Sequence, residues 1–163
     1  MSEGYAQQTQ ANERFLTFYL GEEYYGVSIY AVKEIIALMR STRVPKAPAY
    51  LRGVMNLRGI IIPVIDTRMR FGMVEREPDM HTAIIIVQIE NDQIGFVVDR
   101  VEEVCVVTPD QFSEPPEFGG QISANFVEKM IRTEEEVIMV LDLKAIFSPE
   151  EMAELEAALA GKG

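Results

Sequence analysis

The chain has 163 residues and a net charge of −11, and nearly half of its residues are apolar. This balance is typical of a globular protein, of a size that forms one domain or two very small halves with a common core. The acidic excess argues against nucleic acid as a partner, because phosphate contacts need an excess of Lys and Arg. No apolar run approaches the ~20 residues that cross a bilayer, so we expect no direct membrane insertion.

The chain begins with a polar, aperiodic segment, residues 1–12, which we expect to be a flexible tail. Its start lacks the basic and apolar regions of a signal peptide. Cys105 is the single cysteine, so no internal disulfide can form. These features together indicate a cytosolic protein.

Short strands separated by turns and brief helices dominate the rest of the chain. In order, we predict a hairpin of residues 15–20 and 24–27, a short helix over 29–38 capped by Ser28, an edge or bulged strand over 60–65 that contains Pro63, a hairpin of 82–89 and 93–98, a strand over 101–107, and a hairpin of 127–132 and 137–141. Ser148-Pro149-Glu150-Glu151 is a capping box with Pro at the first helical position, and it predicts a helix over 148–160 that buries Met152, Leu155 and Leu159.

Two parts of the chain read as copies of each other. Tyr25-Gly26-Val27 and Glu34-Ile35 recur 69 positions later as Ile94-Gly95-Phe96 and Glu103-Val104, and Ile61–Asp66 with Phe71 recurs 76 positions later as Val137–Asp142 with Phe147. Constant offsets indicate a duplicated supersecondary unit. We therefore predict an all-β fold of two small five-stranded β-barrels, over approximately 13–80 and 81–147, which share an apolar core because each is too small to fold alone.

Charge is unevenly distributed along the chain. Residues 31–76 carry nine basic and three acidic side chains, a net charge of +6, which leaves −17 for the remainder. These charges either solvate opposite sides of a barrel or give the molecule two faces of opposite sign that contact different partners.

Asp66 and Asp142 are the best candidates for catalysis, since each ends the same strand of its repeat, as in the carboxylate dyad of aspartic proteases. However, Thr67-Arg68 and Leu143-Lys144 follow them, where a dyad needs small residues. The other interpretation, which we favour, is that each Asp caps the helical turn after its strand.

Other chemical machinery is sparse. His81 is the single histidine, and with one cysteine the chain offers neither a zinc ligand set nor a Cys–His pair. Cys105 reads as a small buried hydrophobic residue. Gly53 and Gly59 fit no phosphate-binding loop. We expect no cofactor, no metal and no enzymatic activity.

The segment 44–59 stands out, because two prolines stiffen it and two glycines allow unusual backbone angles. It presents Arg58 directly before a buried strand. Arg58 either recognises carboxylates or carbonyls of a partner or braces the carbonyls of its own loop.

These motifs closely resemble those of the CheW family of chemotaxis coupling proteins. The resemblance lies in Pro45-x-x-Pro48, Gly53-Val54-Met55-Asn56-Leu57-Arg58-Gly59, Ile62-Pro63-Val64-Ile65-Asp66, Gly95-Phe96-Val97-Val98-Asp99-Arg100-Val101 and Pro116-Glu117-Phe118. It extends over roughly residues 13–158, in order.

The resemblance implies a non-enzymatic, cytoplasmic adaptor with two SH3-like barrels, recruited to chemoreceptor arrays. Its partners would be the regulatory domain of a CheA-type histidine kinase and the cytoplasmic tip of methyl-accepting chemoreceptors. The implied partner-binding residues are Val32, Glu34, Gly53, Asn56, Arg58, Gly59, Glu117 and Phe118. One departure is Lys129, where the family has glycine.

Two other functions remain open to test. A duplicated-barrel hydrolase would use Asp66 and Asp142. A small-ligand or peptide-binding barrel pair outside chemotaxis would use neither carboxylate.

Overall fold

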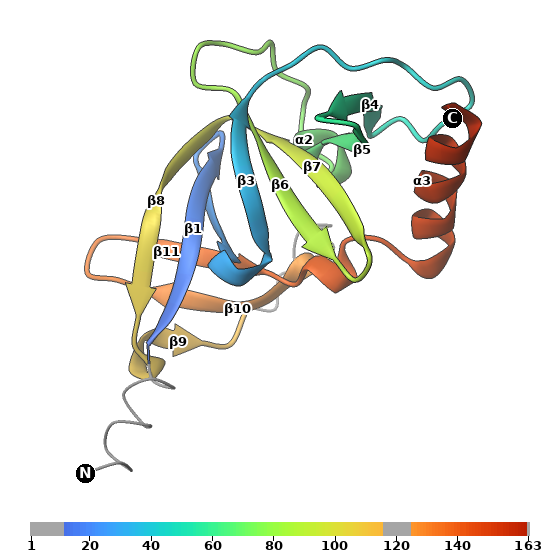
Figure 1. The fold of residues 1–163 in the computed structure, drawn as a ribbon. Helices are drawn as coiled ribbons and strands as arrows, with labels where there is room; N and C mark the ends of the chain where they lie inside the picture. The colour runs from blue at the N-terminus through green and yellow to red at the C-terminus, as the bar shows by residue number, and fades with distance from the viewer. Residues whose placement is uncertain (1–11, 116–124, 163) are drawn as a thin grey trace.

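The structure is a computed structural model that describes residues 12–115 and 125–162. In these residues eleven strands form two sheets, with a helix at the C-terminal end (Figure 1). The predicted tail up to residue 11, and the predicted partner-binding residues Glu117 and Phe118, lie outside the described residues. Within the described part no helix is long and apolar enough to cross a membrane.

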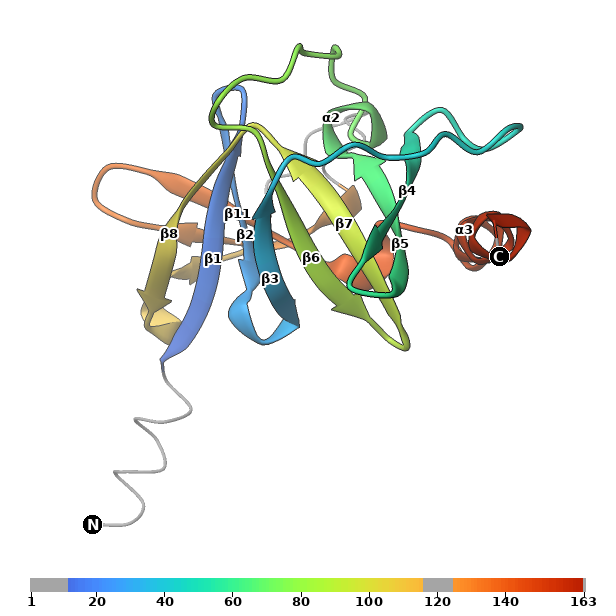
Figure 2. The ribbon, with the colours of Figure 1, turned by 45° about the horizontal axis from the view of Figure 1, so that its top comes forward.

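Figure 2 labels most strands of the two sheets, and Figure 1 labels β9 and β10. Sheet A has the order β8 (Arg100–Val107), β1 (Glu13–Leu20), β2 (Glu23–Ser28), β11 (Val137–Leu141), β10 (Val127–Arg132) and the two-residue β9 (Phe112–Ser113). Sheet B has the order β3 (Val32–Ala37), β6 (Ala83–Ile89), β7 (Asp92–Val98), β5 (Ile60–Asp66) and β4 (Leu51–Leu57). The helical elements are η1 (Ile29–Ala31), α2 (Thr67–Arg70), η2 (Pro109–Gln111), η4 (Leu143–Ala145) and α3 (Pro149–Lys162).

The two sequence repeats exchange their first hairpins. The β1–β2 hairpin of the first repeat joins sheet A, and the β6–β7 hairpin of the second repeat joins sheet B. Each exchanged hairpin has an antiparallel pairing on one side, β1 with β8 or β6 with β3, and a parallel pairing on the other, with Val140 beside Gly26 or Val64 beside Gly95. These two parallel pairs are equivalent under the offsets of 69 and 76, so the duplication read from the sequence is a true structural pseudo-symmetry. The exchange also means that each sheet contains strands of both halves.

Both barrels close in the same way, by the chain that follows an edge strand. After β3, Thr42 pairs with Val54 of β4, and the two backbone hydrogen bonds are both 2.8 Å long. After β8, the short β9 pairs with β10 at the equivalent place, Ser113 beside Met130.

The buried side chains form three clusters that match this architecture. Met55, Ile62, Val64, Ile84 and Ile86 fill the barrel of sheet B. Phe15, Tyr24, Val107, Ile131, Ile138 and Val140 fill the barrel of sheet A. The largest cluster contains residues of both sheets and of α3, so the two barrels share a hydrophobic core, as the sequence predicts.

The predicted helix over 29–38 is wrong. A 3₁₀ turn covers only Ile29–Ala31, and β3 then runs over Val32–Ala37. Ser28 does cap the turn, since its Oγ accepts a hydrogen bond from the N–H of Tyr30. The side chains after it alternate between half-buried and exposed, which is the period of a strand, and β3 pairs with β6.

The three predicted hairpins and the C-terminal helix are confirmed. The expectation of an edge strand around Pro63 is wrong, because β5 lies in the interior of sheet B, between β7 and β4. Proline is tolerated there because β7 pairs with β5 only from Val64 onward, so the missing N–H of Pro63 leaves no gap in that pairing. At the start of α3, Ser148 and Glu151 make both hydrogen bonds of the capping box, 2.8 and 3.1 Å long. Leu155 of this helix is buried, as expected, and Met152 and Leu159 are half-buried.

Arg70 fastens α3 and η4 to the first half of the chain. Its guanidinium donates to the carbonyl oxygen of Ile146 and pairs with Glu151 at 2.9 Å. It also lies over the ring of Tyr50, 4.9 Å from the ring centroid. This largely buried cation therefore serves the fold.

Candidate partner-binding surface

Arg58 and Gly59 form the two-residue turn between β4 and β5. Their φ angles are 51° and 90°, so both lie in the left-handed region that a type I′ hairpin turn requires. The N–H of Gly59 donates to Oδ1 of Asn56 at 2.8 Å, which fixes the turn. A Cβ at Gly59 would meet no atom within 4 Å, so glycine is required there by the backbone angle alone.

Arg58 is an unusual residue for its place. A side chain with a Cβ costs about 1 kcal/mol or more in the left-handed region, where Gly or Asn would be favoured. Arg58 nevertheless stands there, with 68% of its side chain exposed. Arg58 thus holds a long exposed cation at a strained backbone position.

Arg58 pairs with Glu34 of β3, and one of its Nη atoms donates to a carboxylate oxygen of Glu34. In the described part of the chain the Arg58 side chain makes no hydrogen bond to the carbonyls of its own loop. The interpretation that Arg58 braces this loop is therefore not supported. β3 and β4 are the two edge strands of sheet B, so this pair spans the side where the barrel closes. The structure thus brings Glu34 and Arg58 together from positions 24 apart in the chain.

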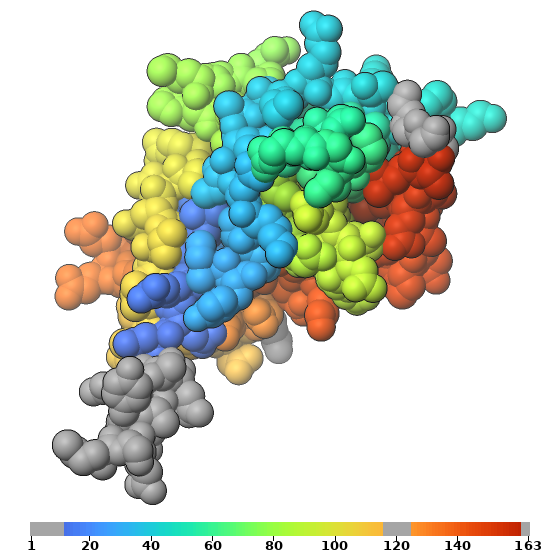
Figure 3. Space-filling model, viewed as in Figure 1, coloured from blue at the N-terminus to red at the C-terminus, as the bar shows by residue number. Residues whose placement is uncertain are grey.

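Residues 28–45 form a continuous band across the face shown in Figure 3. Val32 lies at the start of β3, half-buried against the shared core. Lys33 and Ile35 are exposed on the same strand. Glu34 is therefore presented by a strand whose base is anchored in the core.

The fold itself requires glycine at position 53. It is buried, its φ is 154°, and a Cβ would lie 2.5 Å from the carbonyl oxygen of Thr42. Glycine at this place lets β4 approach Thr42 closely enough for the two hydrogen bonds that close the barrel. Any effect of Gly53 on a partner would pass through this closure.

The sequence prediction missed two apolar residues beside Arg58. Ile60 and Ile61 belong to the predicted strand over 60–65, but they are exposed, while Ile62 is fully buried. They lie before Val64, where pairing with β7 begins, so this end of β5 is not paired with β7. A two-residue turn directly before an apolar run could have indicated that the first residues of the run lie at an exposed tip.

The equivalent turn of the second barrel has the opposite charge. Glu134 and Glu135 connect β10 to β11, and the N–H of Thr133 donates to the carbonyl oxygen of Glu136 across the turn. Neither glutamate has a positive φ.

Lys129 occupies the place equivalent to Gly53. Its Nζ lies 4.1 Å from the ring centroid of Phe112 in β9 and 3.9 Å from the carboxylate of Glu13. This barrel therefore accommodates a side chain at the place where the first barrel excludes one.

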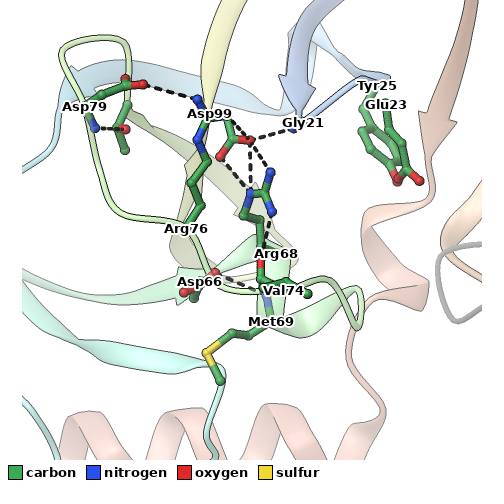
Figure 4. A network of polar contacts seen from close by, with 11 residues as sticks. Gly21, Glu23, Tyr25, Asp66, Arg68, Met69, Val74, Arg76, Asp79 and Asp99 are labelled. Carbon is green, nitrogen blue, oxygen red and sulfur yellow. Dashed lines mark hydrogen bonds and ion pairs between the residues drawn. The ribbon is translucent and has the colours of Figure 1, made fainter.

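A polar network around Asp99 supports the first barrel against the β1–β2 turn (Figure 4). The Asp99 carboxylate accepts hydrogen bonds from the N–H of Gly21 at 2.6 Å and from Nε of Arg68 at 3.0 Å. Arg76 reaches the same carboxylate, and Arg68 also holds the carbonyl oxygen of Val74. Burial by itself would raise the pKa of Asp99, but the hydrogen bonds from Arg68 and Gly21 outweigh it and lower this pKa.

The candidate catalytic carboxylates serve as helix caps. Asp66 accepts a hydrogen bond from the N–H of Met69, and Asp142 accepts one from the N–H of Lys144, each 3.1 Å long. The described residues contain no group of three or more His, Cys, Asp or Glu side chains placed to hold a metal ion. Cys105 is half-buried, and burial raises the pKa of its thiol, which disfavours the nucleophilic thiolate.

Comparison with known proteins agrees with the geometry. Residues 14–151 match the model of the CheW-like domain. Two relatives, each named as a chemotaxis protein CheW, come from Klebsiella aerogenes and Treponema pallidum. The first is 34% identical over 86% of this chain and 85% of its own length, and the second is 33% identical over 87% and 86%.

The solved structures contain a similar protein. The crystal structure of the scaffolding protein TtCheW from Thermoanaerobacter tengcongensis superposes with a TM-score of 0.78 and 34% identity, over 85% of this chain and 94% of that one. The family match over residues 14–151 includes the strands of both repeats. The chain therefore belongs to the CheW family.

Proposed function

We propose that this protein is a non-catalytic chemotaxis scaffold that couples chemoreceptors to a histidine kinase. Its partners are the regulatory domain of a CheA-type kinase and the cytoplasmic tip of methyl-accepting chemoreceptors. It works in the cytoplasm and is recruited to membrane-associated receptor arrays. The relatives named as CheW and the neighbour named as a scaffolding protein support this role.

The observation that carries the proposal is the exposed Arg58–Glu34 pair on a strained but rigid turn. A solvent-exposed ion pair contributes about 0–1 kcal/mol to stability. Arg58 and Glu34 can therefore separate and bind groups of a partner protein instead, at little cost in free energy. The planar guanidinium of Arg58 can then bind a carboxylate or carbonyl of that partner. Ile60 and Ile61 beside it add apolar area that a partner would bury.

The other predicted site residues support this tip. Asn56 and Gly59 fix the turn, Val32 anchors the strand that carries Glu34, and Gly53 closes the barrel beneath. We propose the same partner-binding role for Glu117 and Phe118 of the second half, by the family resemblance alone.

Co-sedimentation with receptor-containing membranes and kinase tests the role. The wild-type chain is expected in the pellet, and Arg58→Ala is expected to reduce that fraction while its thermal unfolding stays unchanged. Arg132→Ala, which removes an exposed arginine from β10, is the matched control.

Three outcomes would contradict the proposal. A wild-type chain that stays in the supernatant would indicate a binding module outside chemotaxis. An equal loss of co-sedimentation in the Arg132→Ala control would show that Arg58 has no special role in binding. An unfolded Arg58→Ala variant would mean that the arginine serves the fold.

A further inference from the structure

An open cleft of about 680 Å³ lies away from the Arg58 turn, where the connection from β3 to β4 meets the loop after α2. Its lining combines four arginines (Arg40, Arg43, Arg52, Arg76), three acids (Asp66, Glu75, Glu77) and an apolar part that includes Met39, Leu51 and Met69. In Figure 3 the two contributing segments, residues 38–45 and 74–80, lie at the upper edge of the molecule. We call this hollow the arginine cleft.

Three of the four arginines of the cleft lack a partner among the described residues, whereas Arg76 pairs with Asp79 and Asp99. In residues 12–115 and 125–162, the side chains of Arg40, Arg43 and Arg52 form no hydrogen bond and no ion pair. This contrasts with Arg58, Arg68, Arg70 and Arg76, which all pair with carboxylates. The free positive charge of the +6 segment is thus concentrated here and at two exposed lysines, Lys33 and Lys46.

The apolar part of the cleft has the composition of a binding surface. Met39 and Met69 expose 41% and 37% of their area, although large apolar residues are usually buried. Methionine and arginine are both enriched at protein interfaces, methionine because its flexible thioether adapts to different shapes. Their combination in one hollow favours a polypeptide ligand.

The acidic residues of the cleft limit which class of ligand can bind there. Asp66, Glu75 and Glu77 line the same hollow and would repel a densely charged polyanion such as polyphosphate. A polypeptide segment with both signs of charge avoids this repulsion, because its carboxylates can face the arginines and its basic side chains the acids.

We propose that the arginine cleft binds a mixed-charge segment of a partner protein, with carboxylates on Arg40, Arg43 and Arg52 and apolar contact on Met39 and Met69. This surface is separate from the Arg58 turn, and its test does not depend on the identity of the kinase or receptor.

The test uses the full chain and a displayed library of random peptides of about 16 residues. Peptides are selected on the wild-type chain and counter-selected on Arg40→Glu/Arg43→Glu. Enriched sequences are expected to carry both acidic and basic residues. A synthetic enriched peptide should shift the methyl resonances of Met39 and Met69 and bind at least about tenfold more weakly to the double variant.

The matched control is Arg14→Glu/Arg132→Glu, the same charge change at two exposed arginines of sheet A, which should leave affinity within about twofold. Thermal unfolding of both variants checks that they fold. The proposal would be wrong, and the cleft a simple polyanion site, in either of two cases. The enriched sequences could be uniformly acidic, or inorganic tripolyphosphate could displace the peptide at equal charge. No enrichment over counter-selection, or no shift of the two methionines, would overturn it.

Discussion

The two barrels have the same topology but differ at the places where each closes and turns. Gly26 and Gly95, Asp66 and Asp142, and Phe71 and Phe147 are equivalent and perform the same tasks in both halves. Other equivalent positions carry different residues: Gly53 in the first half corresponds to Lys129 in the second, and Arg58-Gly59 corresponds to Glu134-Glu135.

The retained glycines and phenylalanines serve the strand exchange and the shared core, where a change in either half would disturb both sheets, and the retained aspartates cap equivalent helical turns. The differing positions lie at the barrel closures and at exposed turns, where each half is independent. The retained positions therefore build features that both halves share, whereas the differing positions set how each barrel closes and which charge its exposed turn carries.

Gly53→Ala should produce the largest effect on stability. The new Cβ would lie 2.5 Å from the carbonyl oxygen of Thr42, so the backbone bonds between Thr42 and Val54 must lengthen or break. We expect a loss of about 3 kcal/mol in the free energy of unfolding, measured by chemical denaturation. An effect below 1 kcal/mol would show that the barrel can open here without cost.

Asp99→Asn should follow, because its carboxylate is 15% exposed and holds Gly21, Arg68 and Arg76 together. The variant leaves Arg68 without its charged partner, and we expect a loss of about 2 kcal/mol. Asp79→Asn, at a more exposed carboxylate that also pairs with Arg76, is the control and should cost less.

The Asp99 network also predicts a pH dependence. The folded-state pKa of Asp99 is lowered, so its contribution to stability is complete above the ordinary value of 3.8 and is lost as the pH falls from there towards the folded pKa. The difference in unfolding free energy between wild type and Asp99→Asn should therefore shrink below pH 4. A difference that persists unchanged at lower pH would mean that the network acts through shape alone.

The hairpins could be predicted because turn residues and period-2 patterns are local signals, and the shared core followed from the duplication. Residues 29–38 were misjudged because Ile29, Val32 and Ile36 fit a helical stripe, while the pairing of β3 with β6, some 50 positions away, decides for a strand. The exchange of hairpins was not predictable either, since repeats do not reveal which copy a hairpin joins.

Within the candidate site, the sequence indicated a stiff loop over 44–59 that presents Arg58. The structure instead forms strand β4 over Leu51–Leu57, which the sequence reading missed, and places Arg58, exposed, in the hairpin turn after it. Its contact with Glu34 depends on barrel closure, which no local pattern encodes. The arginine cleft was visible only as a positive segment, because the sequence does not say which arginines find carboxylates.

Gly59→Ala should cost about 1 kcal/mol, clearly less than Gly53→Ala. The Cβ at residue 59 has open space around it, so only the strain of a φ of 90° remains. Chemical denaturation of both alanine variants gives the comparison directly. If they lose equal stability, backbone angle alone accounts for both glycines, and the close approach of Thr42 to Gly53 contributes nothing.

Lys129→Ala should have the smallest effect, about 0.5 kcal/mol. It removes the contact of the ammonium group with the Phe112 ring and a long, half-exposed pair with Glu13, and both are weak at a solvated site. The same strand position would then tolerate alanine in the second barrel and reject it in the first, where Thr42 leaves no room for a Cβ. A loss as large as that of Gly53→Ala would instead mean that Lys129 holds β9 in place. The second barrel would then need a side chain at this position to close, whereas the first barrel closes because Gly53 has no side chain.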